Sequence, residues 1–405
     1  MKQPYLDPAI LCPLLWVSVI GAALASGLDF YPLSDAFFLY MPVAVTTFSL
    51  TAVAGHALAL NLEIARIAYA RLSALRVQLT PVALIRLHLC CMVLSLMFQC
   101  LDHQLIAGGI WWQPSGLIIY RLAVSEFGVP VNFRFTAVLN YFFFALAPLL
   151  WMYWGEITKR LRLACVLCLT FFVYLSTSRA SFFTIVLLTV LFILHFRPRI
   201  ELVGLVALLL FFAFQLIGAL VGKSGSAAFW IYLYAPTFAL DQIIQGIRTD
   251  VAGAFYTFYP LQPLLGRLGF IAERQSNNLS YYATPYRTNV YTVFGPLILD
   301  YGLTGSIIWI GIFGTISGLI RGMQRRVPTV PFMAFLSSLS ITILLLGVFH
   351  DYYTTAGYVW FTLVFSTALF PRVLPAGRRS HAPSVLQTVG RGANETSPAI
   401  AVVPL

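Results

Sequence analysis

Apolar residues are grouped in about ten long runs, and short polar stretches separate most of these runs. A helix of about 20 apolar residues spans the hydrocarbon core of a bilayer, whereas the strands of a membrane barrel are shorter and alternate in polarity. The pattern therefore predicts an all-α fold, a polytopic integral membrane helical bundle with about ten transmembrane helices. The expected spans are 9–28, 36–60, 82–101, 135–155, 162–178, 180–196, 200–221, 296–320, 329–349 and 356–374.

Composition and charge agree with this interpretation. Hydrophobic residues make up 60% of the chain and charged residues only 10%, against about a quarter charged in ordinary globular proteins. The net charge of +11 does not indicate nucleic-acid binding, because the basic residues follow the positive-inside rule when the N-terminus is placed inside. Eight of the 25 lysines and arginines then lie outside, namely Arg121, Arg134, Arg179, Lys223, Arg248, Arg267, Arg274 and Arg287.

Three segments lie between or beyond the expected spans. The first outer segment, about 102–134, is mixed apolar and aromatic, which predicts interfacial or re-entrant helices. The second, about 222–295, is one large outer loop, and a loop of this length is usually functional. The residues from 376 to 405 are rich in Pro, Gly, Ser and Arg and are expected to form a disordered cytoplasmic tail. The chain thus divides into a membrane domain, 1–375, and this tail.

Arg179 lies in the short connection 177–181 between two apolar runs. An arginine at the outer membrane boundary is costly unless it is paired or reaches the interface. It could anchor lipid headgroups, or it could bind an anion, because the planar guanidinium matches phosphate in a bidentate manner. Both interpretations remain open from this residue alone.

The large outer loop carries more arginines, on the membrane face where the positive-inside rule disfavours them. Arg248, Arg274 and Arg287 alternate with several tyrosines. Guanidinium groups beside aromatic rings suit a ligand that joins phosphate to sugar, because the rings pack against the C–H faces of the sugar. These arginines are therefore candidate substrate-binding residues.

Asp300 and His350 are the candidate catalytic residues. Each could transfer a proton, but Asp300 could instead interact favourably with a helix N-terminus, and His350 could be an interfacial anchor. Four further outer acids could also serve as the base, and the sequence does not rank them. They are Glu126, Asp241, Asp250 and Glu273.

Nucleotide-binding, zinc-protease and nucleophile-elbow motifs are absent from the sequence. The six cysteines lie in or beside apolar runs, and Cys165-x-x-Cys168 has no second ligand pair. We therefore expect neither a metal nor a cofactor. Because an outer-face enzyme has no supply of ATP, synthesis there needs a membrane-borne donor, and a lipid-linked diphosphate sugar fits the arginines.

Three motifs carry a family resemblance: Ser178-Arg179 between two spans, Asn289-Val290-Tyr291-Thr292 after the large loop, and Asp300-Tyr301-Gly302-Leu303-Thr304-Gly305. The pattern resembles the O-antigen polymerases, or oligosaccharide repeat-unit polymerases, of bacterial inner membranes. The resemblance implies a metal-independent, multispanning glycosyltransferase that polymerises undecaprenyl-diphosphate-linked oligosaccharide repeats at the periplasmic face.

The resemblance also implies roles for individual residues. Arg179 and Arg287 would bind the diphosphate, while Asn289, Tyr291 and Asp300 would shape the acceptor side. A chain-length regulator and a flippase are the implied protein partners, and the lipid bilayer and the lipid-linked oligosaccharide are the others.

Two other classes of membrane protein share parts of this pattern. An O-antigen ligase, which transfers glycan to lipid A core, characteristically relies on a histidine in the large outer loop, and 222–295 contains none. A secondary transporter usually carries ionisable residues at the bilayer midplane or internal repeats, and the expected spans are nearly free of charge. A polymerase is the function that the sequence favours.

Overall fold

The computed structural model describes residues 7–61, 77, 79–125, 129, 132–133, 136–176, 179–197, 201, 204, 208, 212, 215–216, 226–247, 256–258, 282–283, 287–288, 292–349 and 357–372. Every described element is a helix, apart from the antiparallel pair of short strands β1 (Tyr282–Ala283) and β2 (Arg287–Thr288). The helices are α1 (Pro8–Ala25), α2 (Asp35–Leu60), α4 (Pro81–Ala107), the 3-10 helix η2 (Gly108–Ile110), α5 (Pro114–Ser125), α6 (Thr136–Tyr153), α7 (Lys159–Ser176), α8 (Arg179–Phe196), α10 (Ser226–Ile244), α12 (Phe294–Arg326), α13 (Pro331–Leu346) and α14 (Gly357–Leu369).

Helices occupy nine of the ten ranges in which we expected spans, and 200–221 lies largely outside the described residues. Among the described residues, four helices are long and apolar enough to cross a membrane: α1, α2, α4 with η2, and α12. Many large apolar side chains on these helices face outward, including Val17 and Leu39 at 70% and 74% exposure. An apolar surface of this kind suits lipid rather than water.

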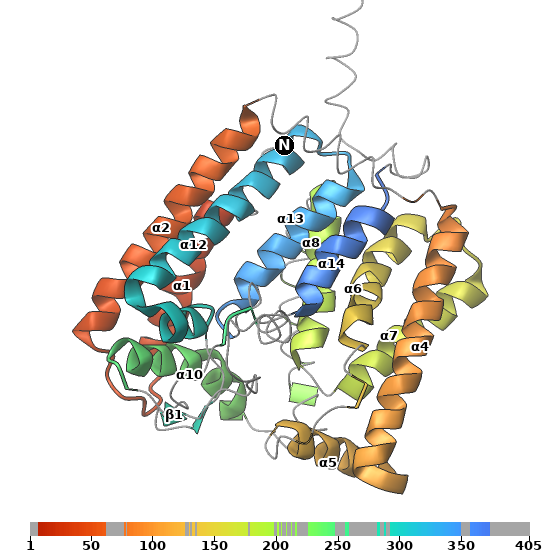
Figure 1. Ribbon diagram of the computed structural model, residues 1–405, viewed down its shortest axis with the longest axis horizontal. Helices are drawn as coiled ribbons and strands as arrows, with labels where there is room; N and C mark the ends of the chain where they lie inside the picture. The colour runs from red at the N-terminus through yellow and green to blue at the C-terminus, as the bar shows by residue number, and fades with distance from the viewer. Residues whose placement is uncertain are drawn as a thin grey trace, which may run out of the picture.

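The helices are arranged in three neighbouring groups (Figure 1). Helices α1, α2 and α12 pack together on one side, α4, α6 and α7 lie on the other, and α8, α13 and α14 lie between them. Helices α5 and α10 and strand β1 lie at one end of the bundle, and the chain begins at the opposite end. The two segments expected to share a membrane face therefore lie at the same end, called here the α5–α10 end.

Helix α10 modifies the expected large outer loop. We expected a loop from about 222 to 295, but Ser226–Ile244 forms a helix that contacts α1, α2 and α12. The segment is apolar and aromatic, and Pro236 lies inside the helix. Burial of its C-terminal half explains how the helix forms despite the proline, since tertiary packing supplies most of the stability of a helix in a protein.

Glycines bring α2 and α12 into direct backbone contact. A Cβ at Gly318 would lie 2.0 Å from the Ala52 carbonyl oxygen, and one at Gly55 would lie 2.2 Å from the Thr315 carbonyl oxygen. Gly314, Gly318 and Gly322 follow one another at four-residue spacing along α12. Small residues at this spacing allow membrane helices to approach closely. This spacing is a signal for close helix packing that is visible in the sequence.

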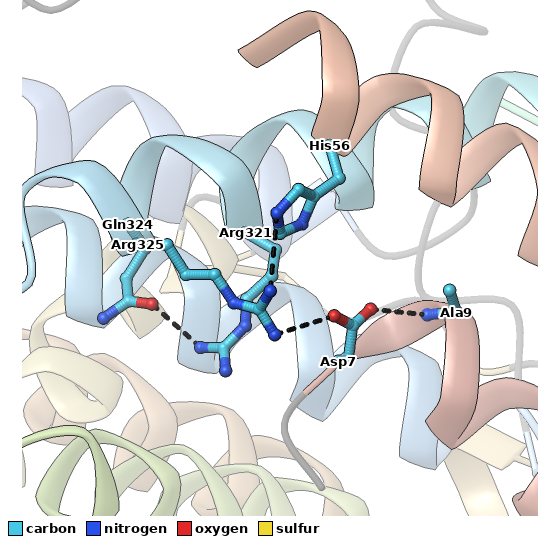
Figure 2. A network of polar contacts seen from close by, with 6 residues as sticks. All are labelled: Asp7, Ala9, His56, Arg321, Gln324 and Arg325. Atoms are coloured by element: carbon cyan, nitrogen blue, oxygen red, sulfur yellow. Dashed lines mark hydrogen bonds and ion pairs between the residues drawn. The ribbon is translucent and has the colours of Figure 1, made fainter. Parts of the chain in front are cut away.

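A polar network joins α1, α2 and α12 at the end opposite to α10 (Figure 2). Arg325 Nη2 lies 2.9 Å from Asp7 Oδ2, and Arg325 Nη1 lies 3.4 Å from His56 Nε2. Asp7 also caps α1 by accepting a hydrogen bond from the Ala9 N–H. The network links the C-terminal end of α12 to α1 and α2. The contacts of its N-terminal end are described in the next subsection.

Candidate functional site

The site begins at a kink in α12. Gly302 has φ 69° and ψ −177°, so the short helix up to Tyr301 is separated from the long helix that follows. A left-handed φ of this kind is readily adopted by glycine and strained for other residues. The kink leaves Asp300 and Tyr301 in the last turn of the short helix, at the α5–α10 end of the bundle.

Asp300 binds a segment of the large outer loop. Its carboxylate accepts hydrogen bonds from the N–H groups of Tyr256 at 3.0 Å and Thr257 at 2.6 Å, and from the Thr257 hydroxyl at 2.6 Å. The Thr257 hydroxyl oxygen also lies 3.0 Å from the Tyr301 hydroxyl. Because a hydroxyl carries one hydrogen, donation to the carboxylate leaves the Thr257 oxygen to accept from Tyr301. Asp300, Tyr256 and Thr257 are called the Asp300 anchor below.

The anchor is followed directly by a strained residue. Phe258 has φ 52°, the one positive φ among the described non-glycine residues. A bulky residue in this region costs about 1–3 kcal/mol and persists only where its surroundings hold it. The Phe258 ring lies 5.0 Å from the Trp309 ring on α12 and 5.7 Å from the Trp360 ring on α14. All three residues are half-buried, so part of this aromatic cluster is exposed.

A second carboxylate holds the first outer segment in a similar way. Asp102, 1% exposed near the end of α4, accepts hydrogen bonds from the Asn132 N–H at 3.0 Å, the Phe133 N–H at 3.2 Å and the Asn132 side-chain amide at 3.1 Å. The neighbouring His103 stacks on Tyr120 of α5 with ring centroids 3.6 Å apart. Burial, and then the negative charge of Asp102, raise the pKa of Tyr120 to about 12.

A third carboxylate joins α10 to the start of α2. Asp241 accepts hydrogen bonds from the N–H and the hydroxyl of Ser34, and from the Gln245 side chain at 2.8 Å. Ser34 also caps α2 by accepting from the Phe37 N–H at 3.2 Å. Asp241 was one of the four acids that the sequence left open as the catalytic base. In the structure its oxygens accept hydrogen bonds from Ser34 and Gln245. The other three, Glu126, Asp250 and Glu273, lie outside the described residues.

The remaining predicted site residues are described only by their place in the chain. Arg179 is the first residue of α8, and Arg287 lies in β2 opposite Ala283. The hairpin contacts α10, and the Tyr174 hydroxyl donates a 2.7 Å hydrogen bond to the Trp112 carbonyl oxygen, so the end of α7 lies beside the segment before α5. Outside the described residues lie Arg248, Arg274, Asn289, Tyr291 and His350.

Sequence reasoning missed several residues of this end of the bundle. Asp102 and His103 are adjacent polar residues at the end of an apolar run, which is a usable signal. Thr257 and Phe258 carried none, because nothing local marks a threonine that will bind an aspartate 43 residues away. Within the described ranges, no three His, Cys, Asp or Glu side chains are grouped so that they could hold a metal ion.

Comparisons with protein-family models, with curated proteins and with solved structures find no match. The chemistry of the site therefore depends on its geometry. Asp300 acts as an anchor for the 256–258 segment, and a role for it as a base stays a prediction. Beside the anchor lie the half-buried rings of Phe258, Trp309 and Trp360, while Arg179 begins α8 and Arg287 lies in β2.

Proposed function

We propose that the protein is a metal-independent glycosyltransferase that polymerises undecaprenyl-diphosphate-linked oligosaccharide repeats into O-antigen or a related surface polysaccharide. The observation that carries the proposal is the Asp300 anchor. It ties the large outer segment to α12 and holds Phe258, in a strained conformation, against Trp309 and Trp360. Strain of this kind is concentrated at functional sites, and half-exposed aromatic rings bind the apolar faces of sugars.

The proposed reaction uses the arginines for the leaving group. The acceptor hydroxyl oxygen attacks the anomeric carbon of the donor glycan, the bond from that carbon to the diphosphate oxygen breaks, and its electron pair leaves with the diphosphate. Arg179 and Arg287 bind this diphosphate and stabilise its growing charge, with Arg248 and Arg274 as further candidates. Asn289 and Tyr291 shape the acceptor side, and Asp300 or His350 receives the proton of the acceptor hydroxyl.

The proposal includes a topology. About ten helices cross the inner membrane, the α5–α10 end faces the periplasm with the 222–295 segment, and the 376–405 tail lies in the cytoplasm. This orientation is supported by the basic residues near the opposite end, such as Arg325 and Arg326 on α12. A flippase that supplies the lipid-linked repeat and a chain-length regulator complete the expected set of partners.

Substitution of the two arginines tests the proposal. Arg179→Ala and Arg287→Ala, each with its expression verified, should shorten or abolish the long chains in the surface-glycan ladder. Lysine at either position should restore the ladder only in part, because an ammonium group cannot make the forked contact. Arg160→Ala is a matched control, since Arg160 is exposed in the first turn of α7, a helix whose other end lies beside the segment before α5. Normal ladders from both outer variants would remove these arginines from the site.

Deletion of the gene tests the reaction class. Loss of long chains, with single repeats still attached to the core, supports a polymerase. Loss of every repeat from the core would indicate the ligase instead, and an unchanged ladder would contradict both glycan functions.

A further inference from the structure

Two fully buried polar side chains lie beside each other between α4 and α6, outside the candidate site. His88 of α4 and Tyr141 of α6 are each 0% exposed, and their ring centroids are 5.4 Å apart. Within the described part of the chain, neither His88 Nε2 nor the Tyr141 hydroxyl has a hydrogen-bond partner. Nearly all buried polar groups in folded proteins are hydrogen-bonded, and the hydroxyl of a buried tyrosine usually finds a partner. Two such groups on neighbouring rings therefore indicate that a molecule other than the chain pairs with them.

The two atoms have complementary hydrogen-bonding roles. His88 Nδ1 lies 2.8 Å from the carbonyl oxygen of Leu84, one turn earlier in α4. Because a carbonyl oxygen only accepts, Nδ1 carries the hydrogen, and in the neutral ring Nε2 is then an acceptor. The Tyr141 hydroxyl carries a hydrogen that it can donate. One acceptor and one donor are thus available on two helices that pack against each other (Figure 1).

Two phenylalanine rings lie against this pair. The Phe142 ring is 5.1 Å from the His88 ring, and the Phe365 ring of α14 is 5.5 Å from the Tyr141 ring. These rings offer no strong donor or acceptor, and apolar residues at positions 88 and 141 would fill the core without leaving polar atoms unpaired. A ligand that stabilises the pair must donate to His88 Nε2, accept from the Tyr141 hydroxyl and fit inside a packed core. Water meets all three requirements.

We propose that one water molecule is bound inside the bundle between α4 and α6, where it donates a hydrogen bond to His88 Nε2 and accepts one from the Tyr141 hydroxyl. Buried waters typically make two to four hydrogen bonds of this kind. The water joins the two helices in the half of α4 that begins at Pro81, away from α5. This site does not depend on the proposed glycan function, because its residues belong to none of the groups assigned to that reaction.

A double-mutant cycle, read by thermal melting of the purified full-length protein in lipid nanodiscs, tests the site. Tyr141→Phe removes only the hydroxyl and should lower the melting temperature by about 2 °C or more, because the water and His88 lose a partner. His88→Phe keeps a ring against Phe142 but removes the acceptor. In the His88→Phe background, Tyr141→Phe should lower the melting temperature much less or raise it, because the hydroxyl has already lost its partner.

Two melting results would overturn the inference. If Tyr141→Phe melts at or above the wild-type temperature, the hydroxyl has no partner in the native protein. If Tyr141→Phe causes the same loss in both backgrounds, the hydroxyl and His88 are not linked. Should His88→Phe fail to fold, Tyr141→Phe still decides the first point, because it differs from the wild type by one buried oxygen atom.

A cryo-electron microscopy map of the wild-type protein, at a resolution that shows ordered water, separates a bound water from a direct contact. A density peak is expected within about 3 Å of both His88 Nε2 and the Tyr141 hydroxyl oxygen. A map in which these two atoms bond to each other, or in which no peak lies between them, would contradict the water site whatever the melting temperatures show.

Discussion

The two segments 102–134 and 222–295 are held by the same chemistry in different surroundings. Asp102 and Asp300 each accept hydrogen bonds from two consecutive backbone N–H groups of a distant segment, 132–133 and 256–257. Asp102 is almost fully buried, whereas Asp300 is half-buried. Asp102 thus holds a packed corner, while Asp300 holds a segment that leads into a strained phenylalanine and a partly open aromatic cluster.

The burial of the two carboxylates and of their donors decides what each substitution should change. The buried carboxylate of Asp102 is satisfied by donors of Asn132, which is exposed, and Phe133, which is half-buried, and hydrogen bonds to a charged group contribute to stability. Asp300 is itself half-buried, but its donors belong to Tyr256 and Thr257, which are buried, and it holds them directly before the half-buried Phe258. We therefore expect substitution of Asp102 to act on folding, and substitution of Asp300 to act on folding and, through the neighbouring Phe258, on the proposed turnover as well.

The largest effect on stability is expected at Asp102. Asp102→Ala removes two charge-assisted hydrogen bonds to backbone N–H groups and should lower the free energy of unfolding by about 3 kcal/mol or more. Thermal melting of the detergent-solubilised protein measures this loss, and Asp102→Asn should fall between the alanine variant and the wild type. A melting temperature that does not change in Asp102→Ala would mean that the corner does not depend on this residue.

Substitution of Asp300 should reduce polymerisation more than it reduces stability. Asp300→Asn keeps one acceptor oxygen but turns an NH₂ group toward the N–H donors, which should cost about 1–2 kcal/mol at a half-buried position. Polymerisation should fall much further, visible as loss of long chains in the glycan ladder at near-normal protein levels. Wild-type chain lengths in this variant would leave Asp300 with an anchoring role of no consequence for turnover.

The smallest effect is expected from a single hydroxyl of the Asp300 anchor. Thr257→Val removes the hydroxyl bond to Asp300 but keeps the backbone bond and the side-chain shape, and should cost about 1 kcal/mol in melting experiments. Thr342→Val serves as control, because the Thr342 hydroxyl is buried but bonds to Ser338 within its own helix. If Thr257→Val reduced chain length as strongly as Asp300→Asn, the hydroxyl rather than the carboxylate would be the important group.

The sequence predicts the helices of this protein far better than the contacts between them. Runs of apolar residues located helices in nine of the ten expected ranges, because a continuous apolar segment in a membrane protein must satisfy its backbone within one helix. Helix α10 was taken for part of a loop, because Pro236 is a helix-breaking residue and its burial against other helices is not visible in the sequence.

The site was only partly predictable for a related reason. Asp300 was selected because a carboxylate beside an apolar run is unusual, but its partners at 256 and 257 lie more than 40 residues away. No periodicity connects such positions, so one sequence cannot pair them. The arginines were selected because they lie on the face that the positive-inside rule disfavours, which is a statement about electrostatics rather than about distance. Asp102 carried a comparable signal and was overlooked.

The direct backbone contact between α2 and α12 limits where this molecule can flex. With carbonyl groups of α2 lying where side chains of Gly314 and Gly318 would be, neither helix can slide without a steric clash. Both are also tied together at the far end through Arg325. Any movement of the short helix up to Tyr301 relative to this pair would therefore have its hinge at Gly302, where α12 is already interrupted.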